Sequence, residues 1–308
     1  MRIAILNKYQ DKVFRGAETF VHELSKRLSK KYEVDVISKN IYLRLLQKKY
    51  DVIVPTNGRF QAIFVRKIAW LSKAKVVTSG QSGMGWDDRI NLYIFPDAFV
   101  ALSSKALAWA KKVNPFVKSV YIPNGVDLSK FKNNKSKKQK ENITVLCVGA
   151  ATKQKRLDLV IKAVAKLEKV NLLIASGGGN LTSEIKKLGN KTLGERFEMV
   201  SVPFDKMPEI YSRADVLTLP SSPSEAFGNV LVEAMASGTP VVARDDLVRR
   251  EIVGDAGLFT DPENTNEYAK TLKKALETDW KDKPRKQAEK FSWDSIAESY
   301  SELLKEIT

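Results

Sequence analysis

Residues that build disulfides and metal sites are scarce in this 308-residue chain. The one cysteine, Cys147, lies in the apolar run ITVLCVG, so no disulfide can form within the chain and the thiol is predicted to be buried in a strand. The one histidine, His22, falls in a helical pattern, which excludes a metal site built from several histidines. An Asp-x-Asp motif is also absent, and we expect neither an obligatory metal ion nor a cofactor.

Long apolar runs are missing too. No stretch of about 18 apolar residues occurs, so the sequence predicts no membrane-spanning helix. The sequence starts directly with a strand pattern rather than with the pattern of a signal peptide, and the default expectation is a cytoplasmic protein. An apolar content of 43% is sufficient for two globular domains with their own cores.

Acidic residues are few in the first part of the chain. Residues 1–140 contain 28 Lys and Arg against 10 Asp and Glu, a net charge of +18, whereas residues 141–308 contain 24 against 26. This asymmetry favours an anionic partner, either a membrane surface, a phosphorylated acceptor or nucleic acid; a lysine-rich solvated surface is the alternative. The lysines are scattered rather than interleaved with aromatic residues, and no nucleic-acid motif occurs, so we expect no nucleic acid partner.

Strand and helix patterns alternate along the whole chain, which predicts parallel sheets with helices on both faces. A polar segment at 130–142 interrupts the alternation and is typical of a linker between domains. We place the first domain at 1–138 and the second at 139–290. The strands are predicted at 2–6, 34–38, 51–55, 75–78, 98–102, 119–122, 143–149, 170–175, 214–219 and 240–243.

Most of the chemical information lies in the segment PSSPSEAFGNVLVEAMASGTPVVAR at 220–244. A strand is predicted before it and another at its end, with a helix that starts near Gly228 between them. Glu225 would then lie above the helix N-terminus, and Glu233 about one turn inside the helix. Parallel sheets bind ligands at the carboxyl ends of strands, and helix N-termini favour phosphate. A bound diphosphate would place Glu225 beside a hexose and Glu233 beside a ribose; a loop carboxylate and a solvated helix residue are the alternative.

The same segment closely resembles the signature of the retaining nucleotide-sugar glycosyltransferases of family 4, in which a Glu, seven residues and a second Glu precede A-M-A-x-G-x-P-V. The resemblance implies the GT-B architecture, with two Rossmann-like, doubly wound domains facing across a cleft. It also implies a C-terminal helix, here at 291–308, that returns to the first domain. The implied activity is transfer of a hexose from a UDP- or GDP-sugar to a hydroxyl acceptor such as a glycolipid or polysaccharide, and the acceptor could be lipid-linked.

The resemblance assigns roles to further residues. Lys155 matches the lysine that grips the donor diphosphate, and with Glu225, which would orient the donor sugar, it forms the implied catalytic pair. The arginine that accompanies this lysine in the family is replaced here by Ala150, so one of two expected cations is missing. Gly16-Ala17 resembles the family's glycine turn at the start of the first long helix. The implied donor contacts are Gly16, Ala17, Gly149, Lys153, Arg156, Gly177, Val202, Phe227, Gly228, Asn229, Val230 and Glu233.

The acceptor side departs from the family. Many relatives place a histidine after the fourth strand, and the corresponding segment here, VVTSGQSGMGWDDR, contains none. Gln81 and Asp87 are the candidates for hydroxyl contacts, and Trp86 is the candidate for stacking on a sugar. The missing arginine and histidine leave a second hypothesis open, a catalytically degenerate protein that binds nucleotide sugars without transferring them.

Two basic helical stretches carry apolar residues that would suit contact between residues 1–140 and an anionic membrane surface. The alternative is that these apolar residues pack against the sheet. They are Ile41, Tyr42, Leu45 and Leu46 beside Arg44, Lys48 and Lys49, and Phe64, Ile68, Trp70 and Leu71 beside Arg66 and Lys67.

Overall fold

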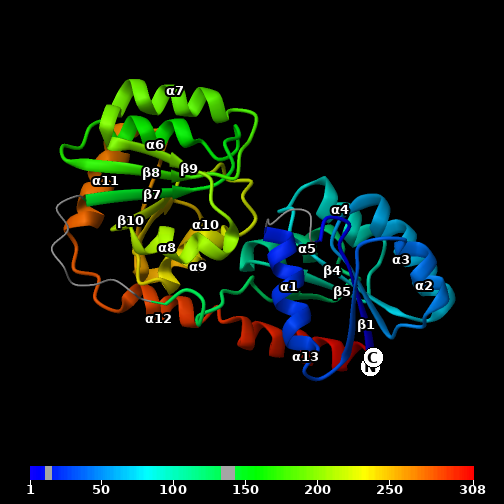
Figure 1. Cartoon of the computed structure of the whole chain (residues 1–308). Helices are drawn as coiled ribbons and strands as arrows, with labels where there is room; N and C mark the ends of the chain where they lie inside the picture. The colour runs from blue at the N-terminus through cyan, green and yellow to red at the C-terminus, as the bar shows by residue number, and fades with distance from the viewer. Residues whose placement is uncertain (11–15, 133–142) are drawn as a thin grey trace. The chain divides into compact units, whose positions relative to one another are not determined.

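The computed structural model describes residues 1–10, 16–132 and 143–308, and the chain divides into two compact units (Figure 1). Unit 1 comprises Met1–Gly125 and Trp293–Thr308, and unit 2 comprises Val126–Ser292. Each unit contains a six-stranded parallel sheet, and the alternation of strand and helix patterns predicts parallel sheets. The strands at 197–200 and 257–260 are not among the ten predicted ones. Most of the segment predicted as a linker, 133–142, lies outside the described residues.

The sheet of unit 1 has the strand order β2-β1-β3-β4-β5-β6. Its strands are β1 (Arg2–Leu6), β2 (Glu33–Ile37), β3 (Val52–Pro55), β4 (Lys75–Ser79), β5 (Ala98–Ala101) and β6 (Ser119–Tyr121). Its helices are α1 (Gly16–Leu28), α2 (Ile41–Gln47), α3 (Arg59–Ser72), α4 (Trp86–Tyr93), α5 (Ser104–Val113) and α13 (Trp293–Ile307).

Two helical layers cover the two faces of this sheet, because alternate residues of a strand point to opposite sides. Ile3 and Ile5 of β1 pack in a cluster with residues of α1 and α13. Ala4 and Leu6 pack in a cluster with residues of α2 and α3. Phe99 of β5 packs with residues of α4 and α5, and α2, α3, α4 and α5 contact one another in that order. One layer is therefore α1 with α13, and the other is α2 to α5.

The sheet of unit 2 has the strand order β12-β11-β10-β7-β8-β9. Its strands are β7 (Ile143–Val148), β8 (Val170–Ala175), β9 (Phe197–Val200), β10 (Val216–Leu219), β11 (Val241–Arg244) and β12 (Gly257–Thr260). Its helices are α6 (Leu157–Val164), α7 (Thr182–Leu193), α8 (Met207–Ser212), α9 (Asn229–Ala236), α10 (Leu247–Val253), α11 (Thr265–Glu277) and α12 (Lys283–Glu289), with the short 3₁₀ turns η1 (Gly194–Arg196), η2 (Phe204–Lys206) and η3 (Gly254–Ala256).

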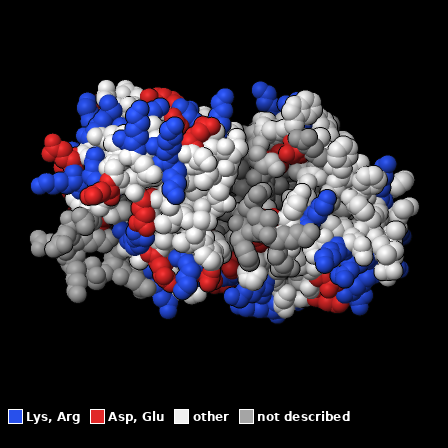
Figure 2. Space-filling model, turned by 45° about the horizontal axis from the view of Figure 1, so that its top comes forward, with Lys and Arg blue, Asp and Glu red and all other residues white. Residues whose placement is uncertain are grey.

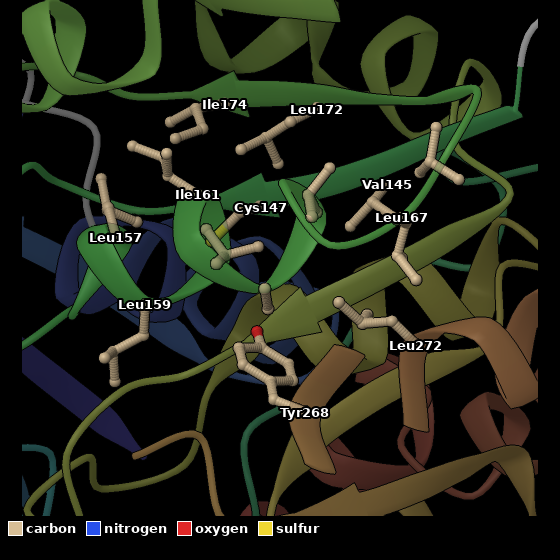
Figure 3. Close-up of a cluster of buried hydrophobic side chains, with 14 of the residues drawn as sticks. Val145, Cys147, Leu157, Leu159, Ile161, Leu167, Leu172, Ile174, Tyr268 and Leu272 are labelled. Atoms are coloured by element: carbon tan, nitrogen blue, oxygen red, sulfur yellow. The ribbon is translucent and has the colours of Figure 1, made fainter. Parts of the chain in front are cut away.

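Cys147 lies in the core of unit 2, among Leu157 and Ile161 of α6 and Tyr268 of α11 (Figure 3). It has no exposed surface, and burial raises the pKa of its thiol to about 12. The thiolate is therefore not formed at neutral pH, and the predicted role as a buried strand residue is confirmed.

Unit 2 begins at Val126, whereas the sequence places the domain boundary at 138. The backbone N–H of Val126 donates to the carbonyl of Phe291 at 2.7 Å. The guanidinium of Arg285 donates to the carbonyl of Phe131 at 2.6 Å. Residues 126–132 thus belong to unit 2 because its own backbone and side chains hold them there.

The C-terminal helix α13 packs against α1 within unit 1. The ring of Phe20 lies 6.0 Å from that of Trp293 and 5.8 Å from that of Tyr300, measured between centroids. Gly125 has to be a glycine, because a Cβ at this position would lie 2.6 Å from Cδ2 of Trp293. Aromatic packing therefore joins the two ends of the chain that form unit 1.

The division into units redistributes the charge that the sequence assigns to residues 1–140. Unit 1 contains 23 Lys and Arg and 13 Asp and Glu, a net charge of +10, and unit 2 contains 29 and 23, a net charge of +6. The contrast between the two parts is therefore smaller than a cut at residue 140 implies, because lysine-rich residues 126–140 belong to unit 2 and the acidic α13 belongs to unit 1. Figure 2 shows Lys and Arg side chains over both units.

In each sheet the order in which the chain adds strands reverses near the centre. In unit 1 the chain runs from β1 to β2 and then crosses to β3, and in unit 2 it runs from β7 through β8 to β9 and then crosses to β10. Sheets of this kind bind ligands at the carboxyl ends of the strands that flank this switch point. The loops after β7 and β10, and those after β1 and β3, are therefore the places where a site is expected.

Candidate functional site

The switch point of unit 2 brings Lys155 and Glu225 together, although they are separated by 70 residues in the sequence. Nζ of Lys155 donates to Oε2 of Glu225 at 2.5 Å, and the two side chains are only 23% and 15% exposed. Lys155 lies in the loop after β7 and Glu225 in the loop after β10. A Cβ on Gly149 would lie 3.3 Å from Cδ of Lys155, so the glycine leaves room for the lysine stem.

Hydrogen bonds between the two loops hold this pair. The backbone N–H of Ser222 donates to the carbonyl of Gln154 at 2.9 Å, and Nε2 of Gln154 donates to Oγ of Ser224 at 3.3 Å. The residue before Lys155 is thereby tied to two residues just before Glu225. The ion pair consequently rests on a fixed backbone rather than on two independent surface side chains.

Helix α9 begins a few residues after Glu225. Gly228 precedes the helix with φ +91°, a left-handed conformation that favours glycine. Phe227 is 2% exposed and its ring packs 5.9 Å from that of Phe291, so this side chain anchors the loop in the core. Asn229 and Val230 form the half-buried first turn, whose backbone N–H groups give the helix N-terminus its partial positive charge.

Glu233 is buried inside α9, which excludes the solvated alternative. It is 8% exposed, and the hydroxyl of the fully buried Tyr211 donates to its Oε2 at 2.6 Å. Burial raises the pKa of Glu233, while the Tyr211 hydrogen bond and the charge of Lys130 oppose this rise. Across the described residues, Tyr211 is the one side chain that hydrogen-bonds this carboxylate.

Phe131 packs on Tyr211 and the charge of Lys130 acts on Glu233, contacts that the sequence did not reveal. The ring of Phe131 lies 5.6 Å from that of Tyr211, and Nζ of Lys130 lies 3.8 Å from the centre of the Phe204 ring. The segment that precedes the linker and the η2 turn therefore meet beside Glu233. No motif spacing connects these residues, because their contact depends on how 126–132 pack on unit 2.

The remaining residues predicted in the loop after β7 differ in their surroundings. Lys153 is exposed, as is Ala150, which stands where the family has an arginine. Arg156 donates two hydrogen bonds of 2.8 Å to the two carboxylate oxygens of Glu263. Nη2 of Arg244 donates to the same carboxylate at 2.9 Å. The guanidinium of Arg156 is therefore bound to Glu263, and a ligand would have to compete for it.

Glycines 177–179 follow β8, and the backbone there contacts the loop after β7. The backbone N–H of Ala151 donates to the carbonyl of Gly178 at 2.8 Å, and a Cβ on Gly179 would lie 2.4 Å from the Ala151 oxygen. A Cβ on Gly177 would meet nothing within 4 Å, so the backbone is open there. Val202, half-buried, follows β9 at the next position along the sheet edge. The backbone near Gly177 and Val202 thus continues the carboxyl edge beyond the Lys155 loop.

Gly16 and Ala17, by contrast, belong to unit 1, where they form the first turn of α1. The switch point of unit 1 also holds a polar network that the sequence did not reveal. Nδ2 of the buried Asn7 donates to Oε1 of Glu18 at 3.4 Å, and the backbone N–H of Asn57 donates to Oε1 of Gln61 at 3.0 Å. Amides and a carboxylate are therefore gathered where the loops after β1 and β3 meet.

The residues predicted for the acceptor lie in the loop after β4 and in α4. Gln81 and Asn124 exchange two hydrogen bonds, of 2.9 and 3.1 Å, through their side-chain amides. Trp86 is 74% exposed at the first position of α4, and Asp87 follows it. The next residue, Asp88, is 1% exposed, and burial with the charge of Asp87 raises the pKa of its carboxyl to about 7.

Metal ligands do not cluster in the part of the chain that the structure describes. Within 1–10, 16–132 and 143–308, no three His, Cys, Asp or Glu side chains gather where they could hold a metal ion. The cations beside the switch point of unit 2 are lysine and arginine side chains.

Comparison with known proteins links this geometry to a family. Residues 129–292 match the model of the family Glycosyl transferases group 1. The chain is 32% identical over 209 residues to an uncharacterized glycosyltransferase of Methanocaldococcus jannaschii, MJ1607, a match that covers 59% of this chain and 52% of that protein. It is 33% identical over 170 residues to phosphatidyl-myo-inositol mannosyltransferase of Mycolicibacterium smegmatis, with 52% and 44% covered. The chain thus spans about half the length of these curated relatives.

Solved structures resemble the chain over its whole length. The TM-score to Anabaena HepE in complex with UDP and glucose is 0.85 at 18% identity, with 99% of this chain and 100% of that chain covered. The TM-score to sucrose-phosphate synthase of Thermosynechococcus elongatus is 0.81 at 18% identity, with 99% and 98% covered. At such identity the likeness concerns the fold, and it confirms the predicted pair of Rossmann-like domains.

Proposed function

The chain belongs to the glycosyl transferases group 1 family, and we propose that it transfers a sugar, with retention, from a nucleotide diphosphate donor to a hydroxyl acceptor. The observation that carries this proposal is the Lys155–Glu225 pair at the switch point of unit 2, next to the N-terminus of α9. A cation, a carboxylate and the backbone N–H groups of a helix N-terminus at one sheet edge suit a ligand that has both phosphates and hydroxyls.

The donor would bind in unit 2 along the carboxyl edge of the sheet. Lys155 and the first turn of α9, at Asn229 and Val230, would contact the diphosphate, and Glu225 would accept hydrogen bonds from hydroxyls of the sugar. Glu233 would accept from the ribose. The backbone near Gly177 and Val202 would line the nucleoside.

Catalysis would come from preorganised charges that stabilise the transition state. When the bond between the anomeric carbon and the diphosphate breaks, negative charge grows on the leaving phosphate and positive charge on the sugar ring. Lys155 and the helix N-terminus would stabilise the leaving phosphate, and Glu225 would orient the ring; no covalent bond to the enzyme is required by this arrangement. Since Ala150 supplies no charge, Lys153 of the same loop would provide the second cation.

The acceptor is proposed to be a glycolipid or a polysaccharide, bound in unit 1 near Gln81, Trp86 and Asp87. Support comes from the matched relatives, which include an inositol-lipid mannosyltransferase and an O-antigen chain mannosyltransferase of Salmonella typhimurium. A lipid-linked acceptor would bring a cytoplasmic enzyme to the inner face of the membrane.

A panel of UDP-, GDP- and ADP-sugars tests this function. We expect release of the nucleotide from at least one donor when a hydroxyl acceptor is added, with the anomeric configuration of the donor kept in the product, as followed by NMR. Glu225→Gln should lose this turnover. Binding of a nucleotide sugar without turnover for any acceptor would instead favour the catalytically degenerate protein that Ala150 suggests.

A further inference from the structure

Helix α3 is apolar on both its inner and its outer side. Its inner side is formed by Ala62, Val65 and Ala69, which have no exposed surface, and Val65 and Ala69 pack in a cluster with residues of the sheet of unit 1. On its outer side, Trp70 is 81% exposed and Leu71 is 77% exposed. A helix at the surface of a domain normally turns charged and polar residues outward, so this outer side requires an explanation.

Four large side chains of α3 share that outer side with a lysine. Phe60, Phe64, Lys67 and Leu71 follow one another at intervals of four, three and four residues, the spacing of one helix face, and Trp70 borders the row. Phe60 is 74% exposed and Phe64 is 50% exposed. The row therefore forms a continuous apolar strip with a positive charge in the middle.

The neighbouring helix α2 widens the strip. The ring of Tyr42 lies 5.5 Å from the ring of Phe64, and Leu46, one turn further along α2, is 66% exposed. The two helices contact each other and lie side by side in the same layer of unit 1 (Figure 1). We call the outer surface formed by Tyr42, Leu46, Phe60, Phe64, Trp70 and Leu71 the α2–α3 face.

Basic residues border the α2–α3 face. Neither α2 nor α3 contains an acidic residue, and Arg44 and Lys67 are exposed and form no ion pair within the described part of the chain. The helices of this layer, α2 to α5, contain eight Lys and Arg against two Asp. The opposite layer, α1 and α13, contains three Lys and Arg against six Asp and Glu. The positive charge of unit 1 is therefore concentrated on the layer that exposes the apolar strip.

We propose that the α2–α3 face docks on the surface of an anionic lipid bilayer. Apolar and aromatic side chains would enter the boundary between headgroups and acyl chains, while Arg44 and Lys67 reach the anionic headgroups. Lysine in the middle of the apolar strip favours lipid over a protein partner, because protein interfaces are depleted in lysine. The contact is peripheral, since none of the described helices is long and apolar enough to cross a bilayer. The proposal goes beyond the transfer reaction and does not depend on it.

Co-sedimentation of the full chain with vesicles tests the proposal. The probes are vesicles of phosphatidylglycerol and phosphatidylcholine in equal parts, and vesicles of phosphatidylcholine alone. We expect binding to the anionic vesicles at low salt and a marked loss at high salt. Arg44→Glu/Lys67→Glu should lower the partition coefficient by at least about tenfold, since each basic residue near such a surface contributes measurably. Trp70→Ser/Leu71→Ser should lower it by a similar factor.

Matched variants separate this face from general effects of charge and exposure. Lys26→Glu/Lys305→Glu makes the same charge change on the opposite layer, and Leu247→Ser removes an exposed leucine of unit 2; both should bind like the wild type. Nucleotide binding should be equal in all variants, which keeps this test distinct from the proposed function. Equal binding to neutral vesicles, no binding to anionic vesicles at low salt, or loss of a dimer in Trp70→Ser/Leu71→Ser without any vesicle binding would overturn the proposal.

Discussion

Lys155 donates to Glu225, and the neighbouring residues of the same loop offer a diphosphate little further positive charge. Ala150 contributes no charge to the loop after β7, and the guanidinium of Arg156 is bound to Glu263. A diphosphate at the switch point of unit 2 would therefore depend on Lys155 to an unusual degree, with Lys153 as the second cation of the loop.

We predict that Lys155→Ala loses nearly all transfer. Ala150→Arg should bind the donor more tightly, by the value of a charge-assisted hydrogen bond, about 1.5–3 kcal/mol. Steady-state transfer and calorimetric titration of the donor measure the two effects. Lys162→Ala, which removes an exposed lysine of α6, is the control and should behave like the wild type. Transfer by Lys155→Ala at the wild-type rate would remove Lys155 from the diphosphate site.

Tyr211 should act through Glu233. In Tyr211→Phe the buried carboxylate loses the hydroxyl that donates to Oε2, so the pKa of Glu233 rises further and its ionised form becomes less favourable. Nucleotide binding should weaken by about 1–3 kcal/mol, and the pH below which binding is lost should move upward. Titrations of nucleotide across pH measure both effects. Tyr32→Phe, which removes a hydroxyl bound to Ser301 in unit 1, should change neither.

The buried carboxyl of Asp88 should make the stability of the protein depend on pH. Its pKa is raised from 3.8 to about 7 in the folded protein, mainly by burial, so folding favours the protonated carboxyl. This contribution to stability is complete below pH 3.8 and is lost as the pH rises to about 7. Asp88→Asn should therefore be stabilised relative to the wild type at pH 8 more than at pH 5, by a few kcal/mol at most (about 1.4 kcal/mol for each pKa unit). Denaturant unfolding at both pH values measures it; equal differences would contradict the buried carboxyl.

At the scale of helices and strands, the sequence predicts which elements exist better than which of their side chains are covered. The apolar runs predict ten of the twelve strands in the described residues, all but β9 and β12. In α2 and α3, however, Leu45 and Ile68 pack against the core, while Trp70 and Leu71 remain exposed. Residue type does not distinguish the covered pair from the exposed pair, because all four residues are large and apolar. The direction in which each side chain leaves the helix axis distinguishes them.

The same limit applies to the candidate site. The motif at 220–244 predicts that Glu225 and Glu233 flank the start of a helix, and the structure has α9 at that position. The contact of Phe131 with Tyr211 has no such signal. It depends on the packing of the segment before the linker on α8, which no local spacing encodes.

Gly125 tests the packing of α13 on unit 1. A methyl group at this position would lie 2.6 Å from Cδ2 of Trp293, so Gly125→Ala has to displace the first residue of the helix. We expect a loss of about 1–3 kcal/mol in the free energy of unfolding. Gly177→Ala is the matched control, because its added methyl would meet nothing within 4 Å. Denaturant midpoints of both variants measure the difference, and equal midpoints would contradict the close contact.

At the scale of the whole molecule, the distribution of charge depends on the fold more than on the order of residues in the sequence. A cut at residue 140 suggests one strongly basic part and one neutral part, yet the two units carry +10 and +6. Within unit 1 the charge is divided by layer rather than by sequence order. The linear sequence does not show this, because α13 joins α1 from the other end of the chain.

The central claim is that unit 2 holds a nucleotide sugar between two carboxylates, and calorimetric titration of Glu225→Ala and Glu233→Ala tests it most directly. Each variant is titrated with free UDP and GDP and with the matching nucleotide sugars. Glu233→Ala should weaken binding of the free nucleotide by about 1.5–3 kcal/mol, whereas Glu225→Ala should leave it unchanged and weaken only the nucleotide sugar. Equal affinity of the wild type and both variants for the nucleotide and for its sugar would contradict the claim.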